Sequence, residues 1–359
     1  MQRFKSWFLG LALSASLVGG TSSSLYSQTE DPSSFDQALQ GVPAMDQQIP
    51  TYTEAPPAMQ PVLFENLSLD SLAPENLAAP LIINDKLLGL FAASDDCFSD
   101  FIAPLSNPLY FENPRTVTEA RLIFANHWFN DANPVFQGGT AQYLAMQVRA
   151  ALTERLSIIA TKDGYIWMNP TNGALGDPDG WANIAAGLKY NLIRDPDAQR
   201  IVSVGTTFEI PAGTKKVFQG NGSGEFHLFL TGGQQIGERW HYMTASGFRL
   251  PSDFAAQSQS WYWSNHVDYA LTDRLYGLVE LNWFHWTGSG KTLPVNFEGV
   301  DLVNLGSTSV AGNDVVTIAF GGRRKLFCAS EVGAGYEVPV SPRKDIFGSR
   351  LYLDLILRY

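Results

Sequence analysis

The last ten residues of the chain, RLYLDLILRY, alternate between two kinds of side chain up to the final residue. A period of two is the spacing of a β-strand, so every second side chain lies on the same face. One face is apolar and carries Leu351, Leu353, Leu355, Leu357 and Tyr359. The opposite face carries Arg350, Tyr352, Asp354 and Arg358. Such a strand is suited to a boundary between lipid and water.

The same alternation recurs from Thr116 onward, in segments of about ten residues separated by turn residues, which is typical of a membrane β-barrel. Strands of this length exceed the five or six residues usual in a soluble β-sandwich, the main alternative fold. The pattern predicts an all-β, antiparallel up-and-down barrel over 116–359. Its twelve strands are expected at 116–129, 140–152, 156–168, 181–193, 199–210, 223–231, 239–249, 260–271, 274–286, 314–321, 326–340 and 348–359.

The connections between these strands alternate in length. Short turns are expected at 153–155, 194–198, 232–238, 272–273 and 322–325. Longer loops are expected at 169–180, 211–222 and 287–313. In bacterial barrels the short turns face the periplasm and the long loops face the outside. An even strand number also places both ends of the barrel on the periplasmic side.

Three segments precede the barrel. Residues 1–28 carry Arg3 and Lys5 ahead of an apolar run, as a secretory signal peptide does. Residues 29–80 are acidic and rich in Pro, Ser and Gln, which predicts a disordered linker. Residues 81–115 are more apolar and are expected to form a short periplasmic cap or plug. After the signal, no apolar run is long enough for a transmembrane helix.

The net charge of −11 comes almost entirely from residues 29–115, which hold 13 acidic residues against Lys86 and Arg115. The barrel region itself is close to neutral. Because basic residues form no cluster, the composition argues against a nucleic-acid partner. The expected partners are instead outer-membrane lipid, the barrel-assembly machinery and a small-molecule solute.

The terminal strand, closed by an aromatic residue, resembles the C-terminal signal of Gram-negative outer-membrane barrel proteins. This resemblance implies that the assembly machinery reads Leu351 to Tyr359 and that the protein resides in the outer membrane. The segments TEARLIFANHWF, ALTERLSIIATKDGY and ALTDRLYGLVELNWF also resemble outer-membrane transporters associated with phenol meta-pathway degradation. That second resemblance implies transport of small aromatic or apolar compounds.

Strand parity predicts which polar side chains point into the lumen. The predicted lumen-lining residues are Glu119, Arg121, Gln147, Arg149, Lys189, Glu209, Glu225, His227, His266, Asp268, Glu280, Asp354 and Arg358. Both signs of charge are represented, so these groups either interlock as ion pairs or line water. A channel for small solutes is therefore expected. The alternative is a barrel without transport that serves as an anchor or as a surface for interactions.

No motif predicts an enzyme, a cofactor or a metal site. The GSGKT at 288–292 resembles a phosphate-binding loop, but His285 stands where the first glycine belongs and no helix is expected to follow. Ser264, His266 and Asp268 share one strand face. Neighbours on that face are roughly 6.6 to 7 Å apart, which predicts that they are too distant for a catalytic relay.

The two cysteines, Cys97 and Cys328, are exported to an oxidising compartment. Cys97 precedes the barrel and Cys328 follows a short turn, so both are expected near the periplasmic mouth. A disulfide between them is a hypothesis, although parity points Cys328 outward.

Overall fold

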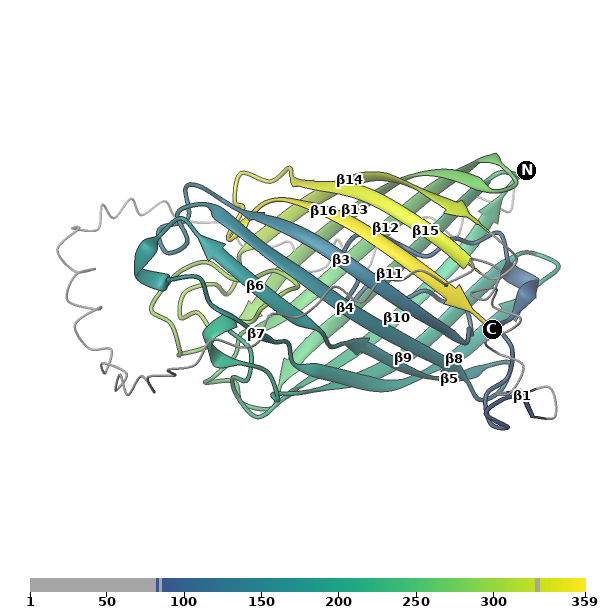
Figure 1. Ribbon diagram of the computed structural model, residues 1–359, viewed down its shortest axis with the longest axis horizontal. Coiled ribbons are helices and arrows are strands. Elements are labelled where there is room, and N and C mark those ends of the chain that lie inside the picture. Colours follow the sequence, from purple (N-terminus) through teal and green to yellow (C-terminus); the bar gives the residue numbers. More distant parts are fainter. Residues whose placement is uncertain (1–81, 84–85, 327–329) are drawn as a thin grey trace, which may run out of the picture. The chain divides into compact units, whose positions relative to one another are not determined.

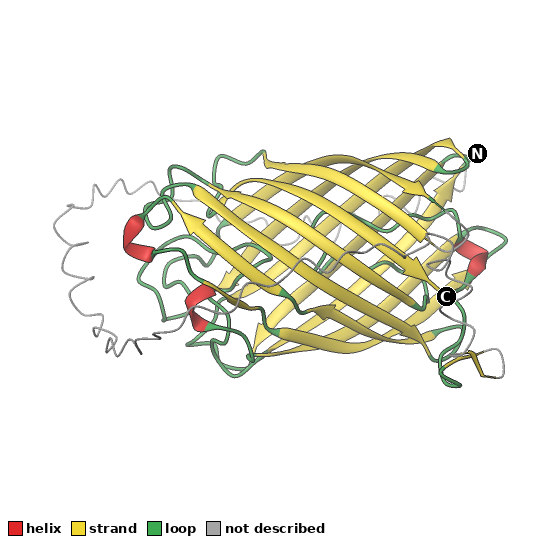
Figure 2. Ribbon diagram, viewed as in Figure 1, coloured by secondary structure: helices red, strands yellow, loops and turns green. Residues whose placement is uncertain are grey.

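The computed structural model describes residues 82–83, 86–326 and 330–359, and most of its regular structure is β-strand (Figures 1 and 2). The predicted signal peptide and linker lie outside these residues. A small hairpin pairs β1 (Ile82–Ile83) with β2 (Lys86–Leu87). Three short 3₁₀ turns are η3 (Asp96–Phe98), η4 (Gly173–Leu175) and η5 (Lys215–Val217). In the described part of the chain, no helix has the length and apolar character needed to cross a membrane.

One antiparallel sheet contains all the longer strands. They are β3 (Glu119–Phe129), β4 (Gly139–Ala151), β5 (Leu156–Lys162), β6 (Tyr165–Pro170), β7 (Asp179–Trp181), β8 (Ile184–Asp195), β9 (Arg200–Ile210), β10 (Glu225–Ile236), β11 (Trp240–Pro251), β12 (Gln259–Thr272), β13 (Leu275–Gly288), β14 (Asp314–Lys325), β15 (Ser330–Pro339) and β16 (Phe347–Arg358).

The sheet closes into a barrel because β3 pairs with both β4 and β16 (Figure 1). β5 and β6 both pair with β4 and form one interrupted wall strand, and β7 and β8 form another. The 14 named strands of the sheet therefore make a twelve-stranded wall. Closure leaves no open sheet edge, which is what a strand structure in lipid requires. The predicted fold class is confirmed.

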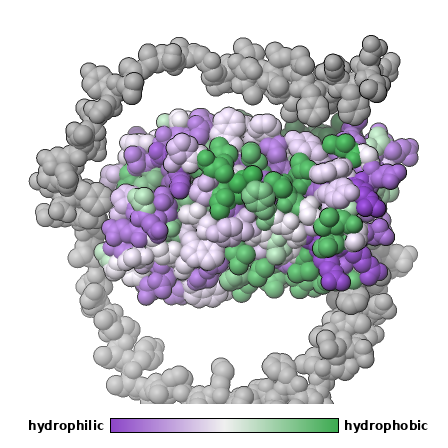
Figure 3. All heavy atoms as spheres, turned by 90° about the horizontal axis from the view of Figure 1, so that it is seen from above, coloured by the Kyte–Doolittle hydropathy of each residue, from purple (hydrophilic) through white to green (hydrophobic). Residues whose placement is uncertain are grey.

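The outer face of the wall is apolar. Large side chains exposed there include Leu122, Leu144, Met146, Leu188, Val204, Leu228, Leu230, Val279, Leu281, Phe320, Leu353 and Leu357. On the side seen in Figure 3, apolar side chains gather over the middle of the barrel, and hydrophilic ones are most frequent near its two ends. An apolar patch of this extent on a soluble monomer would be anomalous, whereas lipid covers it naturally.

The terminal strand lies as its alternation predicts. Leu351, Leu353, Leu355 and Leu357 alternate with the buried Tyr352, Asp354 and Ile356. Arg358 is the register partner of Glu119, so the last strand ends beside the start of the first. The backbone N–H of Tyr359 donates to the carbonyl of Thr118 at 2.9 Å. The role of these residues as an assembly signal stays a prediction.

Two of the expected turns are wrong. Gly232–Ile236 continues β10, and residues 322–325 continue β14, so the expected strands 223–231 and 314–321 end too early. The expected strand 326–340 starts too early, since β15 begins at Ser330. Gly233 was interpreted as a turn residue, yet it faces the interior. A Cβ at Gly233 would come within 2.8 Å of the Phe101 ring, so glycine makes room for a segment inside the barrel.

That inner segment, here called the plug, comprises residues 98–118. Every residue from Phe101 to Thr118 is buried. Leu105 lies against three further inward glycines, Gly321, Gly333 and Gly335, where a Cβ would approach its side chain to between 2.6 and 3.2 Å. The wall and the plug are therefore matched in shape.

A second segment enters the barrel from the opposite end. The loop between β13 and β14, residues 289–313, is here called the lid. Its buried side chains include Phe297, Val300, Leu302, Val303, Leu305 and Val310. They pack with plug and wall residues in one apolar cluster. Because the lid is the longest of the long connections, it belongs to the extracellular end.

Candidate functional site

The thirteen residues predicted to line the lumen all lie on the inner face of the wall. Twelve of them are buried: Glu119, Arg121, Gln147, Arg149, Lys189, Glu209, Glu225, His227, His266, Asp268, Glu280 and Asp354. The thirteenth, Arg358, exposes 10% of its side chain. These groups contact one another, the plug and the lid, and burial of so many charges is tolerable only because they are paired.

Near the periplasmic end, two arginines share one carboxylate. Arg121 Nε and Arg323 Nη2 each donate to Asp354 Oδ2 at 2.7 Å. Beside them Arg358 Nε donates to Glu119 Oε2 at 2.8 Å, and its Nη1 pairs with Glu331. The pairs join β3, β14, β15 and β16 across the seam where the barrel closes.

Two further pairs lie toward the extracellular end. Lys162 Nζ is 2.9 Å from Glu209 Oε1, and Arg249 Nε is 2.7 Å from Glu225 Oε1. The amide of Asn304, a lid residue, also donates to Glu225, at 3.0 Å. The lid thus adds a hydrogen bond from an uncharged amide, whereas both charges of the Arg249–Glu225 pair belong to the wall.

His266 and Asp268 are in direct contact, contrary to the distance expected from their spacing. His266 Nε2 lies 3.0 Å from Asp268 Oδ2, and His241 Nδ1 lies 2.8 Å from the other oxygen of Asp268. The spacing of roughly 6.6 to 7 Å describes backbone positions, and the side chains lean along the strand to meet. Ser264 does not join them, because its hydroxyl accepts a hydrogen bond from the plug residue Asn107 at 3.0 Å.

Glu280 connects this histidine chain to the plug. Its Oε1 lies 2.7 Å from His266 Nδ1 and accepts the backbone N–H of Leu105 at 2.8 Å. Its Oε2 accepts the backbone N–H of Ser106 at 2.6 Å. A carboxylate that accepts two backbone N–H groups satisfies donors that would otherwise be buried without partners.

Wall side chains also satisfy the carbonyl groups of the plug. Arg121 Nη2 donates to Pro104 O at 2.7 Å, Gln147 to Pro108 O at 2.8 Å, and Tyr262 to Tyr110 O at 2.7 Å. Thr231 and Ser203 donate to the carbonyls of Glu112 and Pro114 at 2.7 and 2.6 Å. The plug runs through the lumen without helix or sheet of its own, so the wall replaces the missing backbone partners.

One plug carboxylate takes part in the charged network. Glu112 Oε1 accepts from Arg149 Nε at 2.8 Å and from Lys189 Nζ at 2.7 Å, and Oε2 accepts from Arg149 Nη2 at 2.6 Å. Arg149 also lies 3.3 Å from Glu119. Two of the predicted lumen cations therefore take their main counter-charge from the plug rather than from the wall.

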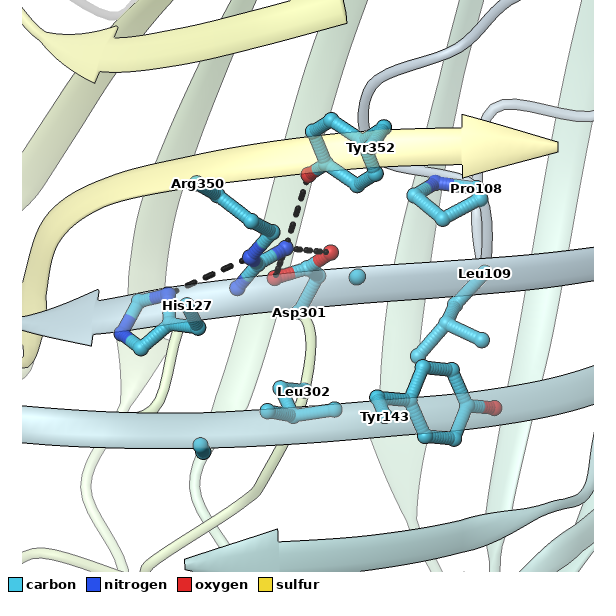
Figure 4. A pocket seen from close by; sticks show the side chains of 10 residues that line it. Pro108, Leu109, His127, Tyr143, Asp301, Leu302, Arg350 and Tyr352 are labelled. Carbon is cyan, nitrogen blue, oxygen red and sulfur yellow. Dashed lines mark hydrogen bonds and ion pairs between the residues drawn. The ribbon is translucent and has the colours of Figure 1, made fainter. Parts of the chain in front are cut away.

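A small cavity of about 10 Å³ separates the plug from the lid (Figure 4). This volume is about that of one water molecule. Its apolar lining includes Leu109 of the plug, Leu302 of the lid, and Tyr143 and Tyr352 of the wall. Arg350 lies at its edge and holds Asp301 of the lid, with Nη1 2.8 Å from each carboxylate oxygen. The plug, the lid and the wall therefore meet around this cavity.

At the periplasmic mouth, Asp95 accepts from Arg194 Nε and Nη2 at 2.8 and 3.0 Å. Partial burial alone would raise the pKa of Asp95, but the arginine and the N–H of Cys97 outweigh it, so the pKa is lowered. A cavity of about 210 Å³ opens here between Ala92, Thr116, Glu154 and Arg194. Cys97 lies beside Arg194, with Sγ 3.3 Å from Nη2. Cys328 lies outside the described residues, so the disulfide stays a prediction.

Several buried charged residues of the network were missed in the sequence. Parity on the β15 segment would have found Glu331 and Glu337, and a longer β14 would have found Arg323. Arg350 belongs to the polar face of the last strand but was not assigned a role. Glu112, Arg115 and Asp301 lie outside the strands, where no period marks the side chains that face inward.

No protein-family model and no curated protein matches this sequence. Solved structures of bacterial barrels do match the fold. An outer-membrane channel from Pseudomonas putida gives a TM-score of 0.52 at 12% identity, over 72% of this chain and 100% of that chain. The NanC and KdgM porins give TM-scores of 0.42 and 0.39 at 8% and 9% identity, each over 67% of this chain and 99% of its own. With its closed twelve-stranded wall and apolar outer face, the chain is a β-barrel of the Gram-negative outer membrane.

Proposed function

We propose that the protein is a channel that passes small solutes across the outer membrane and that the plug and the lid close it in this conformation. The observation that carries the proposal is how the lumen is filled. A barrel of about eight strands is filled by its own side chains, whereas twelve strands enclose a wider space. Here that space is occupied by two segments that are not part of the wall.

The contacts that hold the plug and the lid are of a kind that can be broken and formed again. The plug is held by hydrogen bonds and ion pairs from wall side chains, which can exchange for water. The inward glycines Gly233, Gly321, Gly333 and Gly335 carry no side chain that would fill the space after the plug leaves. Withdrawal of the plug would therefore leave a passage lined by paired charges of both signs.

A lumen of mixed charge discriminates weakly between small anions and cations, unlike a pore ringed by one sign. The passing solutes are therefore small, and ions pass with weak selectivity. For organic solutes, the sequence resemblance to transporters associated with phenol degradation favours small aromatic or apolar compounds.

The alternative is an anchor barrel whose plug never leaves. The density of buried ion pairs favours this second candidate, because such pairs also rigidify a permanent interior. The two functions differ in conductance. Planar-bilayer recordings of the full chain and of a variant lacking residues 81–115 should show a small current that rises in the variant.

Removal of an equally long segment from within 29–80 is the matched control, and it should leave the current unchanged. An absence of current from both the full chain and the variant lacking residues 81–115 would contradict the channel and favour the anchor.

A further inference from the structure

Arg249, a wall residue of β11, contacts both of the segments that fill the barrel. Its Nε and Nη2 donate to the carboxylate of Glu225 on β10 at 2.7 and 3.2 Å. Its Nη1 donates to the carbonyl of Val300 in the lid at 2.8 Å. Its guanidinium carbon lies 4.7 Å from the centre of the Tyr110 ring in the plug. The residue is buried, with 4% of its surface exposed, so one guanidinium joins the wall, the lid and the plug.

The three contacts of Arg249 strengthen one another. Two hydrogen bonds to Glu225 fix the plane of the guanidinium, because a planar fork matches the geometry of a carboxylate. The Tyr110 ring lies against the guanidinium, and a cation–π contact of this kind is strongest where water is absent. The hydrogen bond to the Val300 carbonyl is also stronger in such a low-dielectric site. Withdrawal of the plug would remove the ring, admit water to the guanidinium and weaken its hold on the lid.

The part of the lid that Arg249 holds has a strained backbone. Val300 has a φ of 57°, in the left-handed region that a β-branched residue seldom adopts. Such a conformation persists only where the surrounding contacts fix it. The contacts here are Arg249 with the Val300 carbonyl and Arg350 with the carboxylate of the next residue, Asp301. Loss of the contact to Arg249 therefore favours a relaxed lid that leaves its closed position.

We propose that Arg249 couples the lid to the plug, so that release of either segment favours release of the other. The inference rests on the proposed channel and deepens it, because the two closures then act as one gate. Coupling between two sites is reciprocal, so the plug affects the lid by the same factor as the lid affects the plug. Two independent closures would rarely be open together, because their separate probabilities multiply.

Tyr110→Leu tests the coupling from the side of the plug. It removes the ring beside Arg249 and keeps an apolar side chain. Trypsin added to the purified, folded protein should then cleave the lid near Lys291 at least about fivefold faster than in the wild type. Tyr110→Phe should match the wild type, because it keeps the ring and the Tyr110 hydroxyl has no hydrogen-bond partner among the described residues. Phe101→Leu, which truncates a buried plug ring packed against His241, should leave lid cleavage unchanged.

Asp301→Ala tests the coupling from the side of the lid, because it frees the lid from Arg350. The backbone N–H groups of Leu105 and Ser106 in the plug donate to Glu280 of the wall at 2.8 and 2.6 Å. Their exchange with solvent therefore reports release of the plug. In Asp301→Ala this exchange should quicken by the same factor of about fivefold or more, measured by mass spectrometry.

A double variant tests whether Arg249 carries the coupling. Arg249→Met with Glu225→Gln removes the guanidinium without leaving a carboxylate buried alone. In this background Asp301→Ala should no longer affect plug exchange, and Tyr110→Leu should no longer affect lid cleavage. A full effect in this background, or equal lid cleavage in Tyr110→Leu and Phe101→Leu, would overturn the proposal. If Tyr110→Leu does not fold, plug exchange in Asp301→Ala, with and without the double variant, decides the question.

Neither measurement requires a current, so the coupling and the channel can fail separately. A lid and a plug that respond to each other in a barrel without conductance would support the coupling and contradict the channel. A conducting barrel whose lid and plug respond independently would support the channel and overturn the coupling.

Discussion

The guanidinium of Arg350 holds both carboxylate oxygens of Asp301, each 2.8 Å from Nη1, and thereby ties the last wall strand to the lid. The same nitrogen lies 2.9 Å from the hydroxyl of Tyr352 (Figure 4). This hydroxyl in turn donates to Glu337 at 2.6 Å. This buried contact therefore links the extracellular loop to the charged residues of two strands, β15 and β16. The Arg350–Asp301 ion pair therefore fastens the lid to the wall.

Asp301→Ala should loosen the lid. It leaves the Arg350 guanidinium buried without its carboxylate, and breaking a buried ion pair costs about 3 to 5 kcal/mol. The lid should then leave the mouth more often, and protease added to intact cells should cleave near Lys291 faster than in the wild type. Asn296→Ala, at an exposed position of the same loop, controls for a general effect on the lid. Unchanged cleavage in Asp301→Ala would show that the apolar lid residues alone fix the loop.

Glu280→Ala should loosen the plug. The backbone N–H groups of Leu105 and Ser106 lose a shared acceptor, at about 1 to 3 kcal/mol for each buried group left unsatisfied. Their amide hydrogens should exchange with solvent at least tenfold faster, measured by mass spectrometry on the folded protein. Glu238→Ala, in an exposed periplasmic turn, should leave this exchange unchanged. If the amides of Leu105 and Ser106 are equally protected in both variants, then the other contacts of the plug hold it in place.

The lid should respond to pH through Asp345, which lies in the β15–β16 loop. Burial raises the pKa of this carboxyl to about 6, although Arg343 and the N–H of Glu298 lower it in part. A pKa raised in the folded state means that the folded protein binds this proton more tightly than the unfolded chain does, so protonation of Asp345 stabilises the fold. The contribution of this protonation to the free energy of unfolding is complete below the ordinary pKa of 3.8 and is lost as pH rises through about 6.

The free energy of unfolding should therefore show an excess loss between pH 5 and pH 7 in the wild type, measured by urea unfolding. Asp345→Asn should remove this excess. A flat profile in the wild type would contradict the assignment.

Leu355→Arg should impair assembly. Leu355 pairs in register with Leu122 and Val332 on the apolar outer face. A cation facing lipid near mid-bilayer costs roughly 2 to 4 kcal/mol. The variant should yield less heat-modifiable, folded protein in the outer membrane, as should deletion of Tyr359. Leu355→Met serves as the apolar control. Normal amounts of folded Leu355→Arg would argue that this strand face does not meet lipid.

The alternation of apolar and polar residues predicted the fold because the two faces of each strand meet different solvents. The pattern at Leu351 to Arg358 is enough to assign an inside and an outside, and twelve of the thirteen residues that parity assigned to the lumen are buried. It failed where glycine and charge mimic a turn, as at 322–325. That segment continues β14, and its Arg323 reaches Asp354.

The pairing of the lumen residues was beyond sequence reasoning. Which carboxylate meets Arg121 depends on the register between β3 and β16, and a shift of two residues would exchange the partners on the inner face. The contacts of Glu112 were hidden for a different reason. The plug has no helical or strand period, so its inward side chains carry no periodic signature, and only the tertiary structure brings Glu112 to Lys189.

Single-channel conductance in a planar bilayer tests the central claim most directly. The full chain should show a small, weakly ion-selective conductance, and a variant lacking residues 81–115 should conduct more. Replacement of both Arg121 and Arg149 by Glu in that variant should shift its ion preference toward cations. A complete absence of conductance in the full chain and in the variant lacking residues 81–115 would contradict the channel, and the buried ion pairs would then be the permanent interior of an anchor.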